Sequence, residues 1–194
     1  MAKTPIDAAV AKFDAPQRAA LLETRDRLIS LVPSGTQEIA WSMPTIKVEG
    51  IGIASFSGFA RHNSLFPYDS AGVAYAESKG FEVTKGGIHF DLDKAMPVSI
   101  LRQLVRLRLE SINASFPKKS GEFKEFYPHG GLKASGKMKD GEQHGNWQWF
   151  RKDGTIMRSG SFTSGTQTGT WTTYDSTGSV HKVTEFAKAR RDSR

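Results

Sequence analysis

The last third of the chain repeats itself every 24 residues. Gly121, Gly145 and Gly169 keep this interval, and an aromatic residue stands two positions after each of them. The same interval joins Phe126, Phe150 and Tyr174; Gly130, Gly154 and Gly178; Gly136 and Gly160; Gly141 and Gly165; and Met138, Phe162 and Phe186. A repeat of this length predicts stacked supersecondary units, which are a common platform for binding and rarely for catalysis.

Each unit is predicted to fold as two short strands joined by glycine turns. In the middle unit the strands are residues 147–151 and 156–162, with Asp153-Gly154 at the turn. Asp-Gly favours a hairpin tip because glycine accepts a positive φ. A lone hairpin is marginal in water, so each unit needs its neighbours to cover its aromatic face. We therefore expect an all-β array of three hairpin repeats over residues 121–187.

The aromatic residues of the array are also candidates for an interaction surface. Trp147 and Trp149 point together, because residues two apart in a strand share a face. Packing between repeats explains these side chains more simply than stacking on single-stranded nucleic acid, so we expect a protein partner rather than a nucleic acid. The candidate surface residues are Trp147, Trp149, Phe150, Arg151, Trp171 and Tyr174.

The composition changes at residues 115–121, where a mixed helix and strand pattern gives way to regular glycines. We predict a first domain over residues 1–116, the array over 121–187 and a basic tail over 188–194. Residues 1–117 hold 13 Lys/Arg and 12 Asp/Glu, a net charge of +1, whereas residues 118–194 hold 14 and 8, a net charge of +6. The tail suits an anionic partner or serves solubility alone.

The first domain has helical patterns at both ends and short strand patterns between them. Asp14 is suited to cap the first helix, and Pro16 stands early in it, where a missing N–H costs little. The predicted helices are residues 15–32, 69–79 and 97–114, and the predicted strands are residues 38–43, 46–48, 51–56, 64–66, 82–84 and 88–91. This order predicts an α+β domain, an antiparallel sheet with flanking helices.

Composition and motifs exclude several classes of function. The chain has no cysteine, which excludes disulfides, thiolate metal sites and cysteine nucleophiles. No window approaches the ~18 apolar residues of a membrane span, and the N-terminal residues lack the apolar run of a secretory signal. No phosphate-binding loop and no nucleophile–base pair is present. We therefore expect a cytoplasmic protein without a membrane span that is not an enzyme.

The array pattern, Gly-x-Trp-x-x-Phe/Tyr-x-x-x-Gly followed by Gly-x-Phe/Met-x-x-Gly, resembles the MORN-repeat variant of YwqK-like bacterial proteins over residues 121–186. Two departures suit terminal caps of a short array: Phe123 replaces tryptophan in the first unit, and Thr184 replaces a glycine in the third. Relatives of this type are labelled antitoxin components or left uncharacterised. The resemblance thus implies one alternative function, an antitoxin-like component of a bacterial toxin–antitoxin pair.

The first domain looks like the YdhG-like family, a bacterial domain of unknown function with members sometimes labelled iron chaperones. The resemblance rests on residues 38–44 (Glu-Ile-Ala-Trp-Ser-Met-Pro), 62–67, 86–90 and 106–110. It implies an α+β fold and a cleft lined by Trp41, Met43, Pro44, His62 and Phe66. It also implies iron binding as an alternative function. Hard iron ions prefer carboxylate oxygens, and the acidic residues of this domain are scattered, so we expect no cofactor, with iron as the alternative.

Trp41 is the residue on which the cleft depends. A tryptophan here closes a core or lines a binding cleft, and both alternatives stay open at this point. A metal site built on histidine is another alternative, because His62 and His89 could meet on neighbouring strands. The five histidines of the chain, however, lack the spacing of a compact metal site. The candidate cleft residues are Glu38, Trp41, Met43, Arg61, His62, Phe66 and Arg102. We expect this cleft to bind a small ligand or a partner.

Overall fold

The computed structural model describes residues 4–187, which form two compact units. Within that range the first unit comprises residues 4–111 and 128–130, and the second comprises residues 112–127 and 131–187. The division falls near the end of the helix α4 (Val98–Ala114), slightly before the boundary predicted at residue 116. No helix of residues 4–187 is both long enough and apolar enough to cross a membrane.

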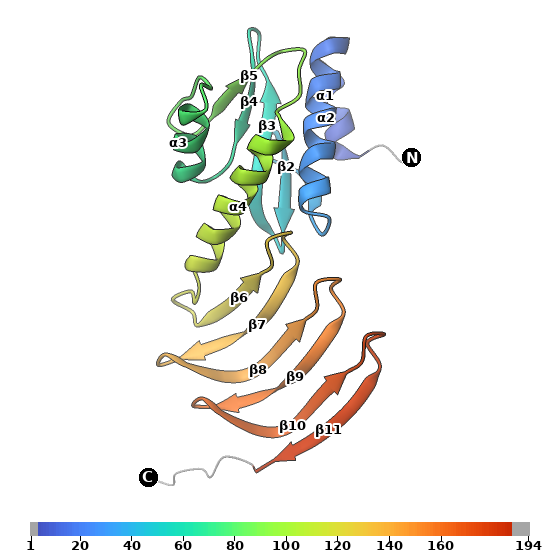
Figure 1. Ribbon diagram of the computed structural model, residues 1–194, viewed down its shortest axis with the longest axis vertical. Coiled ribbons are helices and arrows are strands. Elements are labelled where there is room, and N and C mark those ends of the chain that lie inside the picture. Colours follow the sequence, from blue (N-terminus) through green and yellow to red (C-terminus); the bar gives the residue numbers. More distant parts are fainter. Residues whose placement is uncertain (1–3, 188–194) are drawn as a thin grey trace. The chain divides into compact units, whose positions relative to one another are not determined.

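The first unit opens with two helices, α1 (Pro5–Val10) and α2 (Ala15–Leu31), as Figure 1 shows. The sequence predicted only the second. Its N-cap is Asp14, whose carboxylate accepts a hydrogen bond from the Gln17 N–H at 3.1 Å. The N-cap of the shorter helix is Thr4, which opens a capping box. In this motif two side chains accept hydrogen bonds from backbone N–H groups that the helix leaves free.

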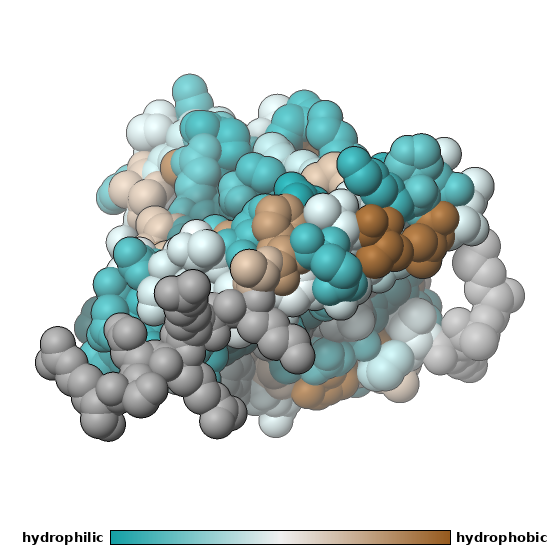
Figure 2. All heavy atoms as spheres, turned by 90° about the horizontal axis from the view of Figure 1, so that it is seen from below, coloured by the Kyte–Doolittle hydropathy of each residue, from teal (hydrophilic) through white to brown (hydrophobic). Residues whose placement is uncertain are grey.

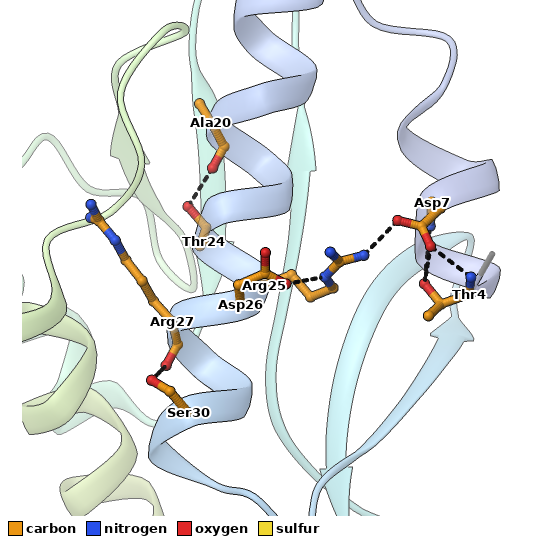
Figure 3. Close-up of polar contacts among 8 residues, drawn as sticks. All are labelled: Thr4, Asp7, Ala20, Thr24, Arg25, Asp26, Arg27 and Ser30. Atoms are coloured by element: carbon orange, nitrogen blue, oxygen red, sulfur yellow. Dashed lines mark hydrogen bonds and ion pairs between the residues drawn. The ribbon is translucent and has the colours of Figure 1, made fainter. Parts of the chain in front are cut away.

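Polar contacts join these two helices to each other (Figure 3), and further contacts join α2 to the segment ahead of α4. Arg25 on α2 donates to the carboxylate of Asp7 on α1 at 2.6 Å. The buried hydroxyl of Thr24 donates to the Ala20 carbonyl at 2.8 Å and accepts from the Met96 N–H at 3.1 Å. Arg27 donates to the Met96 carbonyl at 2.7 Å. One face of α2 therefore holds the loop that leads into α4.

The helices pack on a five-stranded antiparallel sheet. The strands are β1 (Thr36–Ala40), β2 (Met43–Val48), β3 (Ile51–Gly58), β4 (Asn63–Phe66) and β5 (Ile88–Phe90), and they pair in chain order. Helix α3 (Ser70–Ser78) follows β4, as predicted from Asp69 onward. Large side chains from sheet and helices, including Leu21, Ile46, Phe56 and Leu101, are fully buried between them. The predicted antiparallel sheet with flanking helices is confirmed.

Two strand predictions in this unit are wrong. The predicted strand 38–43 is interrupted at Trp41-Ser42, where the chain turns from β1 into β2. Both turn residues have positive φ, which a strand pattern in the sequence does not show. Residues 82–84 form no strand and contribute only one bridge, between Val83 and Ile88.

The second unit is a six-stranded antiparallel sheet. Its strands are β6 (Glu122–Phe126), β7 (Leu132–Lys139), β8 (Glu142–Phe150), β9 (Ile156–Thr163), β10 (Thr166–Tyr174) and β11 (Val180–Phe186), and they pair in chain order. Successive hairpins are thus hydrogen-bonded edge to edge in one continuous sheet (Figure 1).

The glycines at 24-residue spacing make room for tryptophan rings. A Cβ on Gly136 would lie 2.3 Å from the ring of Trp147, and a Cβ on Gly160 would lie 2.2 Å from the ring of Trp171. Each indole N–H donates to a carbonyl on the neighbouring strand, Trp147 to Lys137 at 3.1 Å and Trp171 to Ser161 at 3.2 Å. The 24-residue period therefore reflects a contact that recurs in the sheet, in which a tryptophan ring packs on the backbone of a glycine in the neighbouring strand.

A second periodic contact connects consecutive hairpins. The Tyr127 hydroxyl donates to the Phe150 carbonyl at 2.9 Å. One repeat later, Arg151 donates to the Tyr174 carbonyl at 2.6 Å. Tyr127 and Arg151 occupy equivalent repeat positions, so two chemically different side chains make the same contact between hairpins.

Candidate functional site

Trp41 lies on the surface of the first unit, at the two-residue turn between β1 and β2. Its side chain is 78% exposed, which is unusual for so large an aromatic residue. Ala40 and Met43 pair across the turn. Trp41 has φ 47° and Ser42 has φ 63°, the left-handed values that a type I′ turn requires. Of the two alternatives that the sequence left open for Trp41, burial in the core is excluded.

This turn differs from the other tight turns of residues 4–187. Three more two-residue turns have positive φ at both positions: Glu49-Gly50, Asp140-Gly141 and Ser164-Gly165. Each of these has glycine at its second position, which tolerates positive φ at little cost. Trp41-Ser42 has no glycine. A left-handed residue other than glycine costs about 1–3 kcal/mol, and such strain clusters at binding and active sites.

The Trp41 pocket lies under this indole, with a volume of about 390 Å³. Its lining residues are Trp41, Met43, Phe66, Tyr68, Asp69, Ser70, Val73, Lys85 and Gly86. Large apolar side chains form most of the lining, and Lys85 adds a positive charge. The Asp69 carboxylate caps helix α3 by accepting from the Ala71 N–H at 2.8 Å.

Tyr68 forms a wall of the Trp41 pocket and is held rigidly. Its ring centroid lies 6.2 Å from that of Trp41. Its ring packs on Gly52, where a Cβ would approach it to 2.8 Å. Its hydroxyl shares a short hydrogen bond with Ser55, whose own oxygen lies 2.6 Å from the Thr45 hydroxyl. Gly52 thus leaves room for the Tyr68 ring, and the hydroxyl of Ser55 holds its outer end.

Arg108 on α4 fixes the backbone beside the same pocket. Its guanidinium donates to the Gly52 carbonyl at 2.9 Å and to the Tyr68 carbonyl at 3.0 Å. It also lies over the Tyr68 ring, with the guanidinium carbon 5.7 Å from the centroid. Burial lowers the pKa of Arg108 from its ordinary value, although the guanidinium stays charged at neutral pH. Tyr68, with φ 55°, is thus held in a left-handed conformation by a half-buried cation.

A second pocket, the histidine pocket, lies elsewhere in the first unit and has a volume of about 920 Å³. His62 and His89 stack in its wall with centroids 3.8 Å apart, so the predicted meeting of these two residues occurs. Phe59 stacks on the other side of His62 at 5.3 Å. Burial, and then the neighbouring His89, lower the pKa of His62, which favours its neutral form. Arg61 also lines this pocket.

A buried amide network positions the walls of the histidine pocket. The Gln17 side chain donates to the Asn63 carbonyl oxygen at 3.0 Å and to the Phe59 backbone carbonyl at 3.0 Å. Asn63 in turn donates to the Asp91 carbonyl at 2.7 Å. The segments that carry His62 and Asp91 are therefore tied to helix α2.

The predicted cleft residues divide among four places. Trp41, Met43 and Phe66 meet in the Trp41 pocket, and Arg61 and His62 line the histidine pocket. Glu38 pairs with Lys47 at 2.7 Å on the sheet, and hydrogen bonding to that lysine lowers its pKa. Arg102 is exposed on α4 and lines neither pocket. The single predicted cleft is in fact two pockets.

The predicted aromatic surface of the second unit is largely internal to its sheet. Trp147 is 3% exposed and Trp171 is 2% exposed. Trp149 is half-buried between them, with ring centroids 5.6 Å and 5.7 Å away. The remaining three residues, Phe150, Arg151 and Tyr174, are half-buried as well. These rings pack on one another, as the repeat-packing interpretation predicts.

Iron is the one metal that the family resemblance implied. Within residues 4–187, no group of three or more His, Asp or Glu side chains is arranged to hold a metal ion. The stacked His62 and His89 rings are parallel within 20°, so their in-plane lone pairs do not converge on one point. The described side chains therefore do not fit a resident iron ion.

Sequence reasoning missed several residues that build the Trp41 pocket. Tyr68, Val73 and Lys85 line it, and Arg108 holds its wall. Arg108 carried no distinguishing signal in the sequence, because α4 also contains Arg102, Arg106 and Glu110.

No family model matches the chain. No curated protein matches it either. Its structure is similar to the 1.75 Å crystal structure of YdhG, a protein of the DUF1801 family from Bacillus subtilis, with 19% sequence identity and a TM-score of 0.49. The similarity covers 55% of this chain and 89% of that one.

Proposed function

We propose that the protein is a non-enzymatic binding protein whose ligand site is the Trp41 pocket. The observation that carries the proposal is the position of Trp41, exposed at a strained turn without glycine and directly over a pocket. Exposure of a large aromatic side chain and left-handed strain both oppose stability. A ligand that covers the indole offsets both costs.

The lining of the pocket favours a particular class of ligand. Met43, Phe66 and Val73 provide an apolar floor, and Trp41 and Tyr68 provide aromatic walls. Such a lining with few polar groups is typical of small-molecule sites. A flat apolar group of a small molecule, or an apolar side chain of a partner, suits this space. Lys85 favours an anionic substituent on it.

The proposal is tested with 8-anilinonaphthalene-1-sulfonate, an aromatic anion of this class that fluoresces when bound. Titration of the purified full-length protein gives a dissociation constant for the dye. Trp41→Ala removes one wall of the pocket, and we expect it to weaken binding roughly tenfold or more, as for an aromatic hot spot.

The matched control is Phe59→Ala, which removes another exposed aromatic residue of the same unit that lies outside this pocket. We expect this variant to bind the dye as the unmodified protein does. Equal weakening by the two substitutions, or none by Trp41→Ala, would show that the dye site is elsewhere and would overturn the proposal.

A further inference from the structure

The two edge strands of the six-stranded sheet, β6 and β11, differ in their hydrogen bonding on the outer side. At the β6 edge, the Asn113 side chain donates to the Phe126 carbonyl at 3.1 Å and accepts from the Phe126 N–H at 2.8 Å. The Lys118 N–H also donates to the Glu122 carbonyl at 2.8 Å. At the β11 edge, no strand among residues 4–187 pairs with the outer side. The β6 edge therefore carries hydrogen bonds from outside the sheet, whereas the outer side of β11 has no paired strand in the described part of the chain.

The outward-facing residues of β11 follow from the repeat. In the first hairpin the Met138 N–H donates to the Gly121 carbonyl at 2.7 Å. The equivalent pair in the third hairpin is Phe186 with Gly169. Bonding toward one neighbour alternates along an antiparallel strand. The backbone groups of Phe186, Thr184 and Lys182 therefore turn toward β10, and those of Glu185 and Val183 turn outward, up to the register shift at His181.

The outward set contains an exposed apolar residue at its centre. Val183 is 53% exposed, whereas Ser135 and Ser159 stand at the equivalent positions of the first two hairpins. The end of this sheet that carries β11 faces the viewer in Figure 2, where hydrophobic surface lies among hydrophilic surface. Valine in place of serine increases the apolar area that pairing at this edge would bury.

A further repeat cannot pair with β11 in the register that joins the first three hairpins. Gly136 and Gly160 are covered by the tryptophan of the following hairpin, with no space for a Cβ. Thr184 occupies the equivalent position in β11. Its Cβ and branches fill the space that a further tryptophan ring would need, so the edge requires a different partner.

We propose that β11 pairs antiparallel with β11 of a second copy of this chain, with Val183 opposite Val183. In this two-fold register His181 lies opposite Glu185 twice, and Lys182 lies opposite Thr184. No like charges face each other among these pairs, and Val183 of each copy is covered by the other. The contact is isologous, as in most homodimers, and it joins two sheets into one of twelve strands.

The experiment measures the mass of the full-length protein across a concentration series by sedimentation velocity. We expect a monomer–dimer equilibrium. Val183→Pro removes an outward N–H without removing a bond to β10, and proline is tolerated on such edges. Two hydrogen bonds are lost per dimer, so the dimer dissociation constant should rise roughly tenfold.

Two charge-changing variants supply a second test and leave the backbone intact. His181→Glu places glutamate opposite Glu185 and should weaken the dimer, and adding Glu185→His should restore it. Met157→Ser, which alters an exposed apolar residue of the interior strand β9, should leave the dimer unchanged. A protein that stays monomeric at all concentrations would overturn the proposal. So would a dimer that Val183→Pro and His181→Glu leave intact.

Discussion

Asp7 shows how a single side chain orders the start of the first unit. Its carboxylate accepts from the Thr4 N–H at 2.6 Å and from Arg25 at 2.6 Å. Hydrogen bonding to the Thr4 backbone, followed by that to Arg25, lowers the pKa of Asp7 below its ordinary value. One carboxylate thus closes the capping box of α1 and joins that helix to α2.

The stabilisation by Asp7 depends on pH. Because its pKa is lower in the folded state, the stabilisation is complete above the ordinary aspartate pKa and is lost as pH falls through the lowered value. We expect Asp7→Asn to reduce the free energy of unfolding by roughly 1 kcal/mol at neutral pH. The difference from the unmodified protein should shrink toward zero at acidic pH.

Urea denaturation of both proteins at several pH values measures this difference. Asp26→Asn is the control, because Asp26 also pairs with Arg25 but its side chain is 65% exposed. That variant should change the free energy of unfolding little at any pH. A loss for Asp7→Asn that stays constant down to low pH would contradict the assigned role of the Asp7 charge.

At the scale of an element, the proposed function makes the β1–β2 turn the place where stability and ligand binding oppose each other. Trp41 and Ser42 occupy left-handed positions for which Asn-Gly is the preferred dipeptide. Replacing both residues by Asn-Gly should therefore relieve strain and raise the free energy of unfolding, by about 1 kcal/mol. The same change removes the indole and should weaken dye binding as Trp41→Ala does.

Thermal unfolding compares this double variant with the unmodified protein and with Glu49→Asn. The control substitutes the first residue of the β2–β3 turn, which already has glycine at its second position. It should change the unfolding temperature less than the double variant. A double variant that is less stable than the unmodified protein would show that Trp41 stabilises the fold and is not held there at a cost.

At the scale of the whole molecule, the sequence signals that predicted the structure correctly were a helix cap, the apolar spacing of a helix and the 24-residue repeat. Asp14 and the apolar spacing identified α2, because a cap and its helix are neighbours in the sequence. The 24-residue period identified the strands of the second sheet, because the turn glycines and the aromatic residues Phe123, Trp147 and Trp171 recur in it. Caps and turns are read within a few residues, and the period is read by comparing segments 24 residues apart, so neither needs knowledge of contacts in space.

The candidate site could be predicted only in part. Trp41, Met43 and Phe66 were correctly grouped, yet the positive φ of Trp41 is invisible in a sequence that otherwise favours a strand. Arg108 reaches the Tyr68 carbonyl across 40 residues of chain, and no local pattern encodes that contact. The division of one predicted cleft into two pockets likewise depends on how the sheet places its strand ends.

The central claim is that ligand binding occurs at the Trp41 pocket. The most direct test records ¹H–¹⁵N spectra of the full-length protein with and without 8-anilinonaphthalene-1-sulfonate. We expect the largest shifts on the Trp41 indole N–H and on the backbone N–H groups of Tyr68 and Gly86. Shifts centred instead on His62 and His89, or on Trp149, would contradict it.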